Sequence, residues 1–110
     1  MKYKVVYNTA ISGGLHLSEE AVKWLEDRGM KLKIESGYVE GLARHHPLLV
    51  QCIEALGERA NGPEKGWTSQ AELHVATIKG NLYYIDDHDG AGEEVIDISK
   101  MTDASDLIII

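Results

Sequence analysis

In two stretches of the chain, apolar residues recur every three or four positions, which is the spacing of an amphipathic helix. Each stretch also begins and ends at residues that favour helix boundaries. The first begins at Ser18, a good N-cap residue, and Gly29 suits its end. The second begins at Pro47, because a proline lacks the amide that would be unpaired at the first helical position. We expect Gly57, inside this helix, to allow close approach of another backbone, and residues 61–63 to end the helix. Its apolar stripe comprises Leu49, Cys52, Ile53, Leu56 and Ala60.

Six further segments have the apolar clustering or alternation of β-strands: residues 2–8, 30–35, 72–78, 81–86, 93–98 and 107–110. We expect the third and fourth of these to form a hairpin through Lys79-Gly80, and residues 36–45 and 63–70 to be irregular. The order of elements predicts an α+β fold, with an antiparallel or mixed sheet of about five to six strands covered by two helices. The length suits a single domain of residues 1–110.

Several classes of protein do not fit the chain. No apolar stretch approaches the roughly 20 residues that cross a bilayer. Residues 1–4 lead directly into a predicted strand, without the apolar block of a signal peptide. Cys52 is the only cysteine, so no internal disulfide can form. We therefore expect a cytoplasmic protein that does not associate with membranes.

The negative charge of the chain lies in its final third. The net charge is −7, and residues 1–79 carry ten acidic and ten basic side chains. Residues 80–110 carry eight acidic side chains and one basic side chain, Lys100. Such a surface would repel nucleic-acid backbones, so we expect no direct nucleic-acid binding, and it would attract a basic protein. The alternative to a partner-binding surface is that these acidic side chains only form a solvent-exposed face. The candidate partner surface comprises Asp86, Asp87, Asp89, Glu93 and Glu94.

A Gly-Gly loop between the first strand and the first helix is a candidate anion site. Free amides and the positive end of a helix dipole can bind a phosphate or carboxylate, and glycines allow close approach. The loop matches neither the dinucleotide fingerprint nor the P-loop. The alternative is a tight turn with an ordinary cap. The candidate ligand-binding residues are Asn8, Ser12, Gly13, Gly14 and Ser18.

Basic residues directly before the second helix form the other half of this candidate site. Arg44 can make bidentate contacts with a carboxylate or phosphate, and His45 and His46 can hydrogen-bond a ligand. If both helix starts lie at one edge of the sheet, these residues and the Gly-Gly loop form one anion pocket. The alternative is a helix cap beside an exposed basic loop.

Metal binding and nucleophilic catalysis have little support. Residues 86–89 are potential ligands, but their spacing fails the EF-hand pattern, and the adjacent His45 and His46 lack the spacing of a helical zinc pair. Cys52 lies on an apolar stripe, where a free cysteine is usually inert. We expect no metal and no cofactor, and no residue is identified as catalytic. Hydrolysis by a pair of carboxylates stays open, because a chain with many acidic residues always contains some such pair.

Four motifs stand out along the chain: Val5-Val6-Tyr7-Asn8-Thr9, Gly13-Gly14, Leu17-Ser18-Glu19-Glu20-Ala21 and Arg44-His45-His46-Pro47-Leu48-Leu49-Val50. Together they resemble a widespread family of small proteins of tailed bacteriophages and prophages. The chain departs from this family at Ala10 and Ile11, where the family often has a cysteine and an aromatic residue. The family has no settled activity, so the resemblance implies a phage setting in a bacterial host cell and supplies no mechanism.

Three functions follow as hypotheses. The first is a non-enzymatic phage accessory protein that counters host defence by sequestering a small anionic, nucleotide-like ligand. The second is an inhibitor whose acidic surface binds a basic host defence protein. The third is a small nucleotide-processing enzyme. Self-association into a homo-oligomer stays open.

Overall fold

The structure, a computed structural model, describes residues 3–10, 14–35, 38–62, 71–88, 92–97 and 108–110. Its elements in chain order are β1 (Tyr3–Asn8), α1 (Glu19–Glu26), β2 (Lys33–Glu35), β3 (Tyr38–Glu40), α2 (Pro47–Leu56), the 3-10 helix η1 (Gly57–Ala60), β4 (Leu73–Ile78), β5 (Leu82–His88), β6 (Gly92–Asp97) and β7 (Ile108–Ile109).

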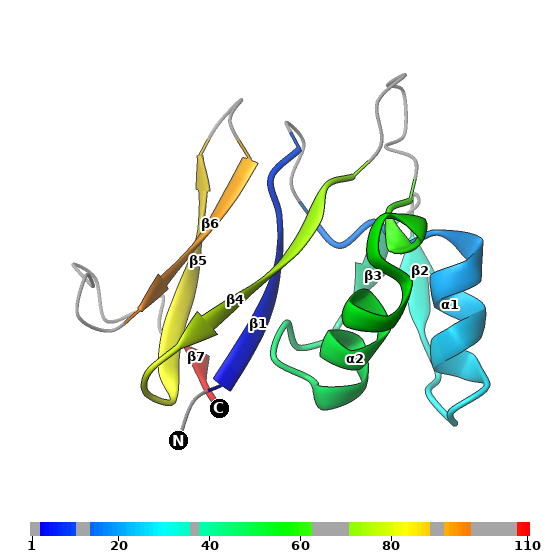
Figure 1. The fold of residues 1–110 in the computed structure, drawn as a ribbon, viewed down its shortest axis with the longest axis horizontal. Coiled ribbons are helices and arrows are strands. Elements are labelled where there is room, and N and C mark those ends of the chain that lie inside the picture. The colour runs from blue at the N-terminus through cyan, green and yellow to red at the C-terminus, as the bar shows by residue number, and fades with distance from the viewer. Residues whose placement is uncertain (1–2, 11–13, 36–37, 63–70, 89–91, 98–107) are drawn as a thin grey trace.

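The elements form layers, with the β1–β4 pair in the middle (Figure 1). On one side lies the sheet β6-β5-β7, and on the other lie α2, α1 and the β2–β3 pair (Figure 1). The described strand pairs are all antiparallel. The predicted α+β class is therefore confirmed, but the predicted single sheet is replaced by three small sheets.

β1 is the central strand because both of its faces are apolar. Val5 is fully buried in a cluster with Ile78 and Tyr83, whereas Val6 is fully buried against the helices. Successive side chains of a strand point to opposite faces, so two consecutive buried valines need cover on both sides. The helices cover Val6, and the sheet β6-β5-β7 covers Val5.

The predicted hairpin through Lys79-Gly80 is wrong, although both of its strands exist as β4 and β5. β4 pairs with β1, whereas β5 pairs with β6 and β7. At Lys79-Gly80 the chain therefore passes from the middle layer into the outer sheet. The physical reason is the second apolar face of β1, which a simple β4–β5 hairpin would leave uncovered.

Residues 36–45 were predicted to be irregular, yet Tyr38–Glu40 forms β3. Val39 lies opposite Ile34 of β2 and is buried. The Val39 N–H donates to the Leu15 carbonyl (2.9 Å), so β3 also supports the segment that leads into α1. Val39 is a β-branched residue that packs well in a half-buried strand, and this was the local signal for β3.

β2 is shorter than the predicted strand over residues 30–35. Met30 and Leu32 pack against the helix-side core, as their apolar spacing predicts, but they lie before β2 begins. Ile34 is 48% exposed, so the alternation predicted for this segment does not extend to its end.

The start of α1 is confirmed, whereas the helix itself ends at Glu26 and a turn continues to Gly29. Ser18 is the N-cap, and its Oγ accepts a hydrogen bond from the Ala21 N–H (3.1 Å). Leu25 is fully buried on the inner face, and the residues after the helix reach Gly29 with a positive φ of 90°. Such a φ favours glycine, which explains why the turn stops there.

α2 begins at Pro47, as predicted, and His46 is its N-cap. The α-helix ends at Leu56, earlier than predicted, and continues as η1. The described apolar stripe is buried at Leu49, Cys52, Ile53 and Ala60.

The role predicted for Gly57 is wrong. A Cβ built on Gly57 meets nothing within 4 Å, so no other backbone approaches it. Gly57 has a φ of +58°, and this left-handed conformation ends α2. Close approach occurs instead at Gly62, where a Cβ would lie 2.4 Å from the Leu17 carbonyl oxygen.

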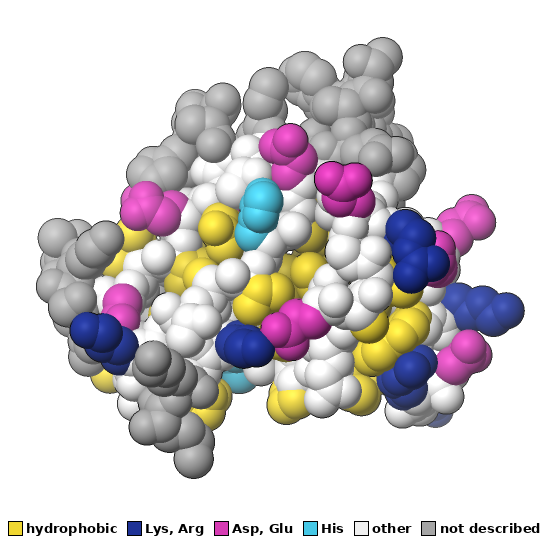
Figure 2. All heavy atoms as spheres, viewed as in Figure 1, with side chains coloured by type: hydrophobic (Ala, Val, Ile, Leu, Met, Phe, Trp, Pro, Cys, Tyr) yellow, Lys and Arg dark blue, Asp and Glu magenta, His cyan; other side chains and the backbone are white. Residues whose placement is uncertain are grey.

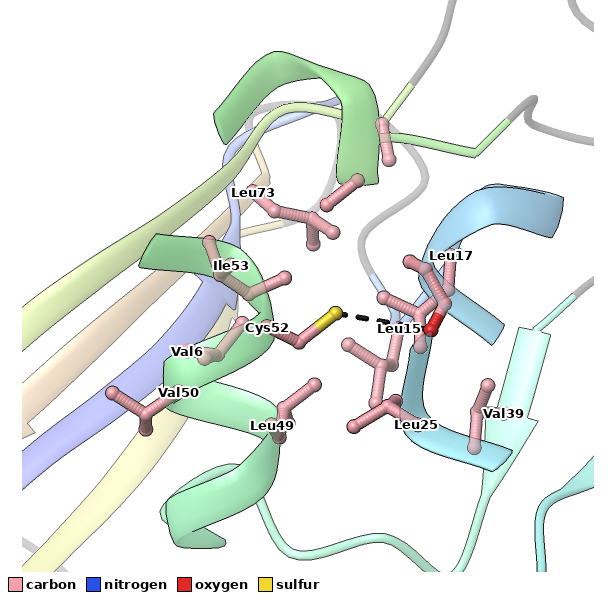
Figure 3. Packing of buried hydrophobic residues seen from close by; sticks show 13 residues of the cluster. Val6, Leu15, Leu17, Leu25, Val39, Leu49, Val50, Cys52, Ile53 and Leu73 are labelled. Carbon is pink, nitrogen blue, oxygen red and sulfur yellow. Dashed lines mark hydrogen bonds between the residues drawn. The ribbon is translucent and has the colours of Figure 1, made fainter. Parts of the chain in front are cut away.

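The helix-side core fills the space between α2, α1 and β1 (Figure 3). Cys52 lies near its centre, with its Sγ donating to the Ala21 carbonyl at 3.8 Å (Figure 3). Burial raises the pKa of the Cys52 thiol to about 11, more than nearby Arg28 lowers it. The thiol therefore stays protonated at neutral pH and behaves as a small apolar side chain, as its position on the stripe indicates.

Candidate functional site

A buried carboxylate, that of Glu93 at the start of β6, joins three distant parts of the chain. Arg44 binds it with both guanidinium nitrogens, Nη1 to Oε1 at 2.7 Å and Nη2 to Oε2 at 2.9 Å. The backbone N–H groups of Asn8 and Gly14 donate to Oε1 and Oε2, each at 2.9 Å. The Arg44 and Glu93 side chains are only 16% and 6% exposed, so this is a largely buried, bidentate ion pair.

The ion pair covers the edge of β1 that β4 leaves free. The Val6 N–H donates to the Arg44 carbonyl (2.9 Å), and Arg44 Nη1 donates to the Val6 carbonyl (3.3 Å). Two residues further along, the Asn8 N–H donates to Glu93. Arg44 and Glu93 thus satisfy the strand's backbone groups where a neighbouring strand would otherwise be needed.

Gly92 allows β6 to begin this close to β1. Its φ is +86°, and a Cβ at this position would lie 2.3 Å from the Thr9 carbonyl oxygen. Only glycine fits such a contact without moving the backbone. The next residue, Glu93, is thereby placed directly beside the end of β1.

The environment of Glu93 favours its charged form. Burial is the largest single influence and raises its pKa, but the hydrogen bond and the charge of Arg44, together with the Gly14 and Asn8 amides, outweigh it. The net effect lowers the pKa of Glu93. Glu93 is therefore ionised at neutral pH and neutralises Arg44.

Asn8 organises the loop that follows β1. It is fully buried, and its Nδ2 donates to the Gly14 carbonyl (3.0 Å). Its Oδ1 accepts from the N–H groups of Ala10 and Glu72, both at 2.9 Å. The side chain therefore closes the loop and attaches it to the start of β4.

Three of the predicted ligand-binding residues do converge on one anion, but the anion belongs to the protein. Asn8, Gly14 and Arg44 all donate to Glu93, which lies 85 residues beyond Asn8 in the chain. An external anion would reach Arg44 only by displacing this carboxylate. The predicted residues Ser12 and Gly13 lie outside the described residues.

The prediction that both helix starts share one end of the molecule is wrong. The Ser18 N–H donates to the Ala60 carbonyl (2.9 Å), and its Oγ donates to the Arg59 carbonyl, so α1 begins beside the end of η1. α2 begins at the opposite end, at Pro47, and the two helices run in opposite directions (Figure 1). Antiparallel packing is the natural result of joining two helices whose apolar faces meet.

Both predicted histidines have structural contacts. His46 Nδ1 accepts the Leu48 N–H (3.1 Å) and so caps α2. His45 Nδ1 lies 2.7 Å from the hydroxyl of fully buried Tyr83. Burial lowers the pKa of His45, and the neighbouring His46 lowers it further. Burial raises the pKa of Tyr83 to about 12, although Arg44 lowers it by a smaller amount. His45 and Tyr83 are therefore uncharged at neutral pH.

The predicted acidic partner surface changes in composition. Glu93 is wrong as a surface residue, because it is buried by its pairing with Arg44. Asp86 and Glu94 lie opposite each other on β5 and β6, and Glu94 is exposed. Asp89 and the side chain of Asp87 lie outside the described residues. Within the described part of the chain, no three potential ligands come together as a metal site.

A cleft of about 780 Å³ lies where β1 and β4 meet the end of α2 and η1. Its apolar lining comes from Ala10, Ile53, Ala71 and Leu73, and all four are buried. Polar side chains and one glycine complete it: Thr9, Gly57, Glu58, Asn61, Glu72 and His74. Figure 2 views the face with β4 and the helices, where acidic side chains and a histidine lie beside hydrophobic atoms. The cleft was not predicted from the sequence, because its lining residues come from three stretches of the chain that are far apart in sequence.

A short chain of polar contacts runs along the rim of the cleft. His74 Nε2 lies 3.1 Å from Thr9 Oγ1, which is also 3.4 Å from Glu72 Oε2. A hydroxyl beside an imidazole is the pairing that activates a nucleophile. Acyl transfer also needs donors for the oxyanion, and the N–H groups of Thr9 and Ala10 are already bound to Glu72 and Asn8.

None of the described helices is long and apolar enough to cross a membrane.

Comparison of the chain with protein-family models, curated proteins and solved structures gives no match. The resemblance to phage proteins therefore stays a prediction.

Proposed function

We propose that this protein acts by binding, and that it captures a small molecule in the cleft between β4 and the end of α2. The cleft itself carries the proposal. Its volume of about 780 Å³ lies within the range of small-ligand sites. Its lining combines buried apolar residues with polar side chains, and small-ligand sites use both kinds of contact.

The proposal keeps sequestration as the mode of action but moves it to another place, and it drops the expected anionic character of the ligand because Glu58 and Glu72 line the cleft. Arg44, the cation of the first candidate site, is neutralised by Glu93 and only 16% exposed. The cleft, in contrast, is lined in part by solvent-exposed side chains, among them Glu58, Glu72 and His74. In a phage setting, a protein of this kind would remove a small signalling molecule from the infected cell.

The test is mass spectrometry of the small molecules that denatured, purified protein releases. Wild-type protein should release a specific molecule in unchanged form. Glu58→Trp places a bulky ring at the rim of the cleft and should abolish this release. Glu26→Trp, the same change at an exposed acid of α1 away from the cleft, is the matched control and should behave as wild type.

Three results would contradict the proposal. Release of no molecule by wild-type protein from phage-infected cells would argue against sequestration. Equal release by Glu58→Trp would place the ligand elsewhere. A chemically altered molecule would favour the nucleotide-processing enzyme.

A second candidate, binding of a basic host protein, has one specific observation in its favour. Asp86 and Glu94 are directly opposite each other on β5 and β6, so two acidic residues lie side by side on this sheet. Neighbouring carboxylates of this kind attract a basic surface. Asp86→Asn with Glu94→Gln should then remove salt-sensitive binding to an oligolysine peptide and leave small-molecule release unchanged.

A further inference from the structure

We infer that the cleft selects ligands with a positively charged head, an ammonium or guanidinium group, on an apolar body. This inference rests on the proposed function and names the chemistry of its ligand. It follows from the charge and the polarity of the residues that line the cleft, where carboxylates lie beside apolar residues.

The rim carries two carboxylates and no lysine or arginine among the described lining residues. Glu58 lies on η1 and Glu72 directly before β4, so they approach the cleft from different elements. Both residues are exposed, and neither forms an ion pair within the described part of the chain. A cationic group bound between them would gain two favourable charge interactions, whereas a phosphate would meet repulsion.

Two described cations near the cleft residues in sequence, Arg59 and Lys4, form ion pairs with other acidic side chains. Arg59 follows Glu58 in the chain, but its Nη1 pairs with Glu20 of α1 at 3.0 Å. Lys4 of β1 pairs with Glu54 at 2.7 Å. Neither of these two cations therefore neutralises Glu58 or Glu72.

The lining supplies the complement for the rest of such a ligand. Ile53, Ala71 and Leu73 are at most 8% exposed and present apolar surface. The rim contact between Thr9 and His74 adds polar atoms beside Glu72. A primary ammonium has three donors and no acceptor, so carboxylates at the rim match it better than they match a hydroxyl or carboxylate head.

Three probes with one apolar body and different heads test this: 2-phenylethylammonium, 2-phenylethanol and 3-phenylpropanoate. Each is titrated into the full chain, and binding is measured from amide chemical-shift changes at Ala71 and Leu73. The ammonium should bind about tenfold or more tighter than the carboxylate, with the alcohol between them and with an affinity that falls as salt rises.

Paired variants assign the selectivity to the rim. Glu58→Gln with Glu72→Gln should weaken the ammonium about tenfold and leave the alcohol unchanged. Glu19→Gln with Glu26→Gln removes the same total charge from exposed positions of α1 and should leave all three affinities unchanged.

The outcomes separate this inference from the proposed function. If the alcohol and the carboxylate bind the cleft as well as the ammonium does, the cationic selectivity is wrong and the cleft remains a ligand site. The same holds if the double glutamine variant retains full ammonium affinity. If no probe shifts the cleft amides while the purified protein still releases a molecule that Glu58→Trp does not release, this inference fails and the proposed function stands.

Discussion

The two sides of β1 are stabilised in different ways. On the helix side, the described cluster contains thirteen buried residues contributed by α1, α2, β1 and neighbouring segments. On the sheet side, the described cluster around Val5, Ile78 and Tyr83 has three fully buried members. There a buried ion pair, Arg44 with Glu93, joins β6 to the edge of β1.

The sheet side shows how a small domain can add directional contacts to apolar burial when it attaches a sheet. Apolar burial is non-directional, so a large cluster tolerates adjustment, whereas a bidentate ion pair with two backbone amides defines one position. Glu93 therefore fixes the position of the start of β6 beside the end of β1, while the helix side depends on the volume and pattern of its apolar side chains.

The largest effect is expected from Glu93→Ala. The substitution leaves the buried Arg44 guanidinium without its partner and removes the acceptor of the Asn8 and Gly14 amides. We expect the free energy of unfolding to fall by about 3–5 kcal/mol, measured by urea denaturation at pH 7.

Glu94→Ala is the matched control, because it removes the adjacent, exposed carboxylate of the same strand. It should change the free energy of unfolding by less than about 1 kcal/mol. Equal effects of the two substitutions would show that the ion pair does not hold the sheet side to β1.

A smaller effect is expected from acidification. The folded-state pKa of Glu93 is lowered, so Glu93 stabilises the fold at pH values above its unfolded-state pKa, which is about 4.3. This stability should be lost as the pH falls below about 4.3 towards the folded-state pKa. Urea midpoints at pH 7 and at successively lower pH should therefore fall more steeply for wild type than for Glu93→Gln. Parallel curves for the two proteins would contradict the assignment.

The smallest effect is expected on the helix side, from Ser18→Ala. This change removes the N-cap of α1 and its link to Arg59, at a cost of about 1 kcal/mol in thermal denaturation. Ser18→Thr keeps a capping hydroxyl and should recover most of the loss. A loss for Ser18→Ala as large as that for Glu93→Ala would remove the contrast between the two regions.

Part of the candidate site could be predicted from the sequence. The residue types at Asn8, Gly14 and Arg44 indicated groups that bind an anion, and the structure brings all three to one carboxylate. The identity of that carboxylate was not visible, because Glu93 is 49 residues from Arg44 in the chain. The cleft was missed for the same reason, since its lining joins segments that are adjacent only after folding.

The sequence by itself determined the beginnings of both helices, the α+β class and the burial of Cys52. These features depend on interactions within a few residues, such as the capping of Ser18 and the 3.6-residue spacing of the α2 stripe. Only the tertiary structure decided that β4 pairs with β1, that the two helices begin at opposite ends and that Glu93 neutralises Arg44. The physical reason is that strand pairing and ion pairing join residues far apart in the chain, and their choice depends on which apolar faces of β1 must be covered.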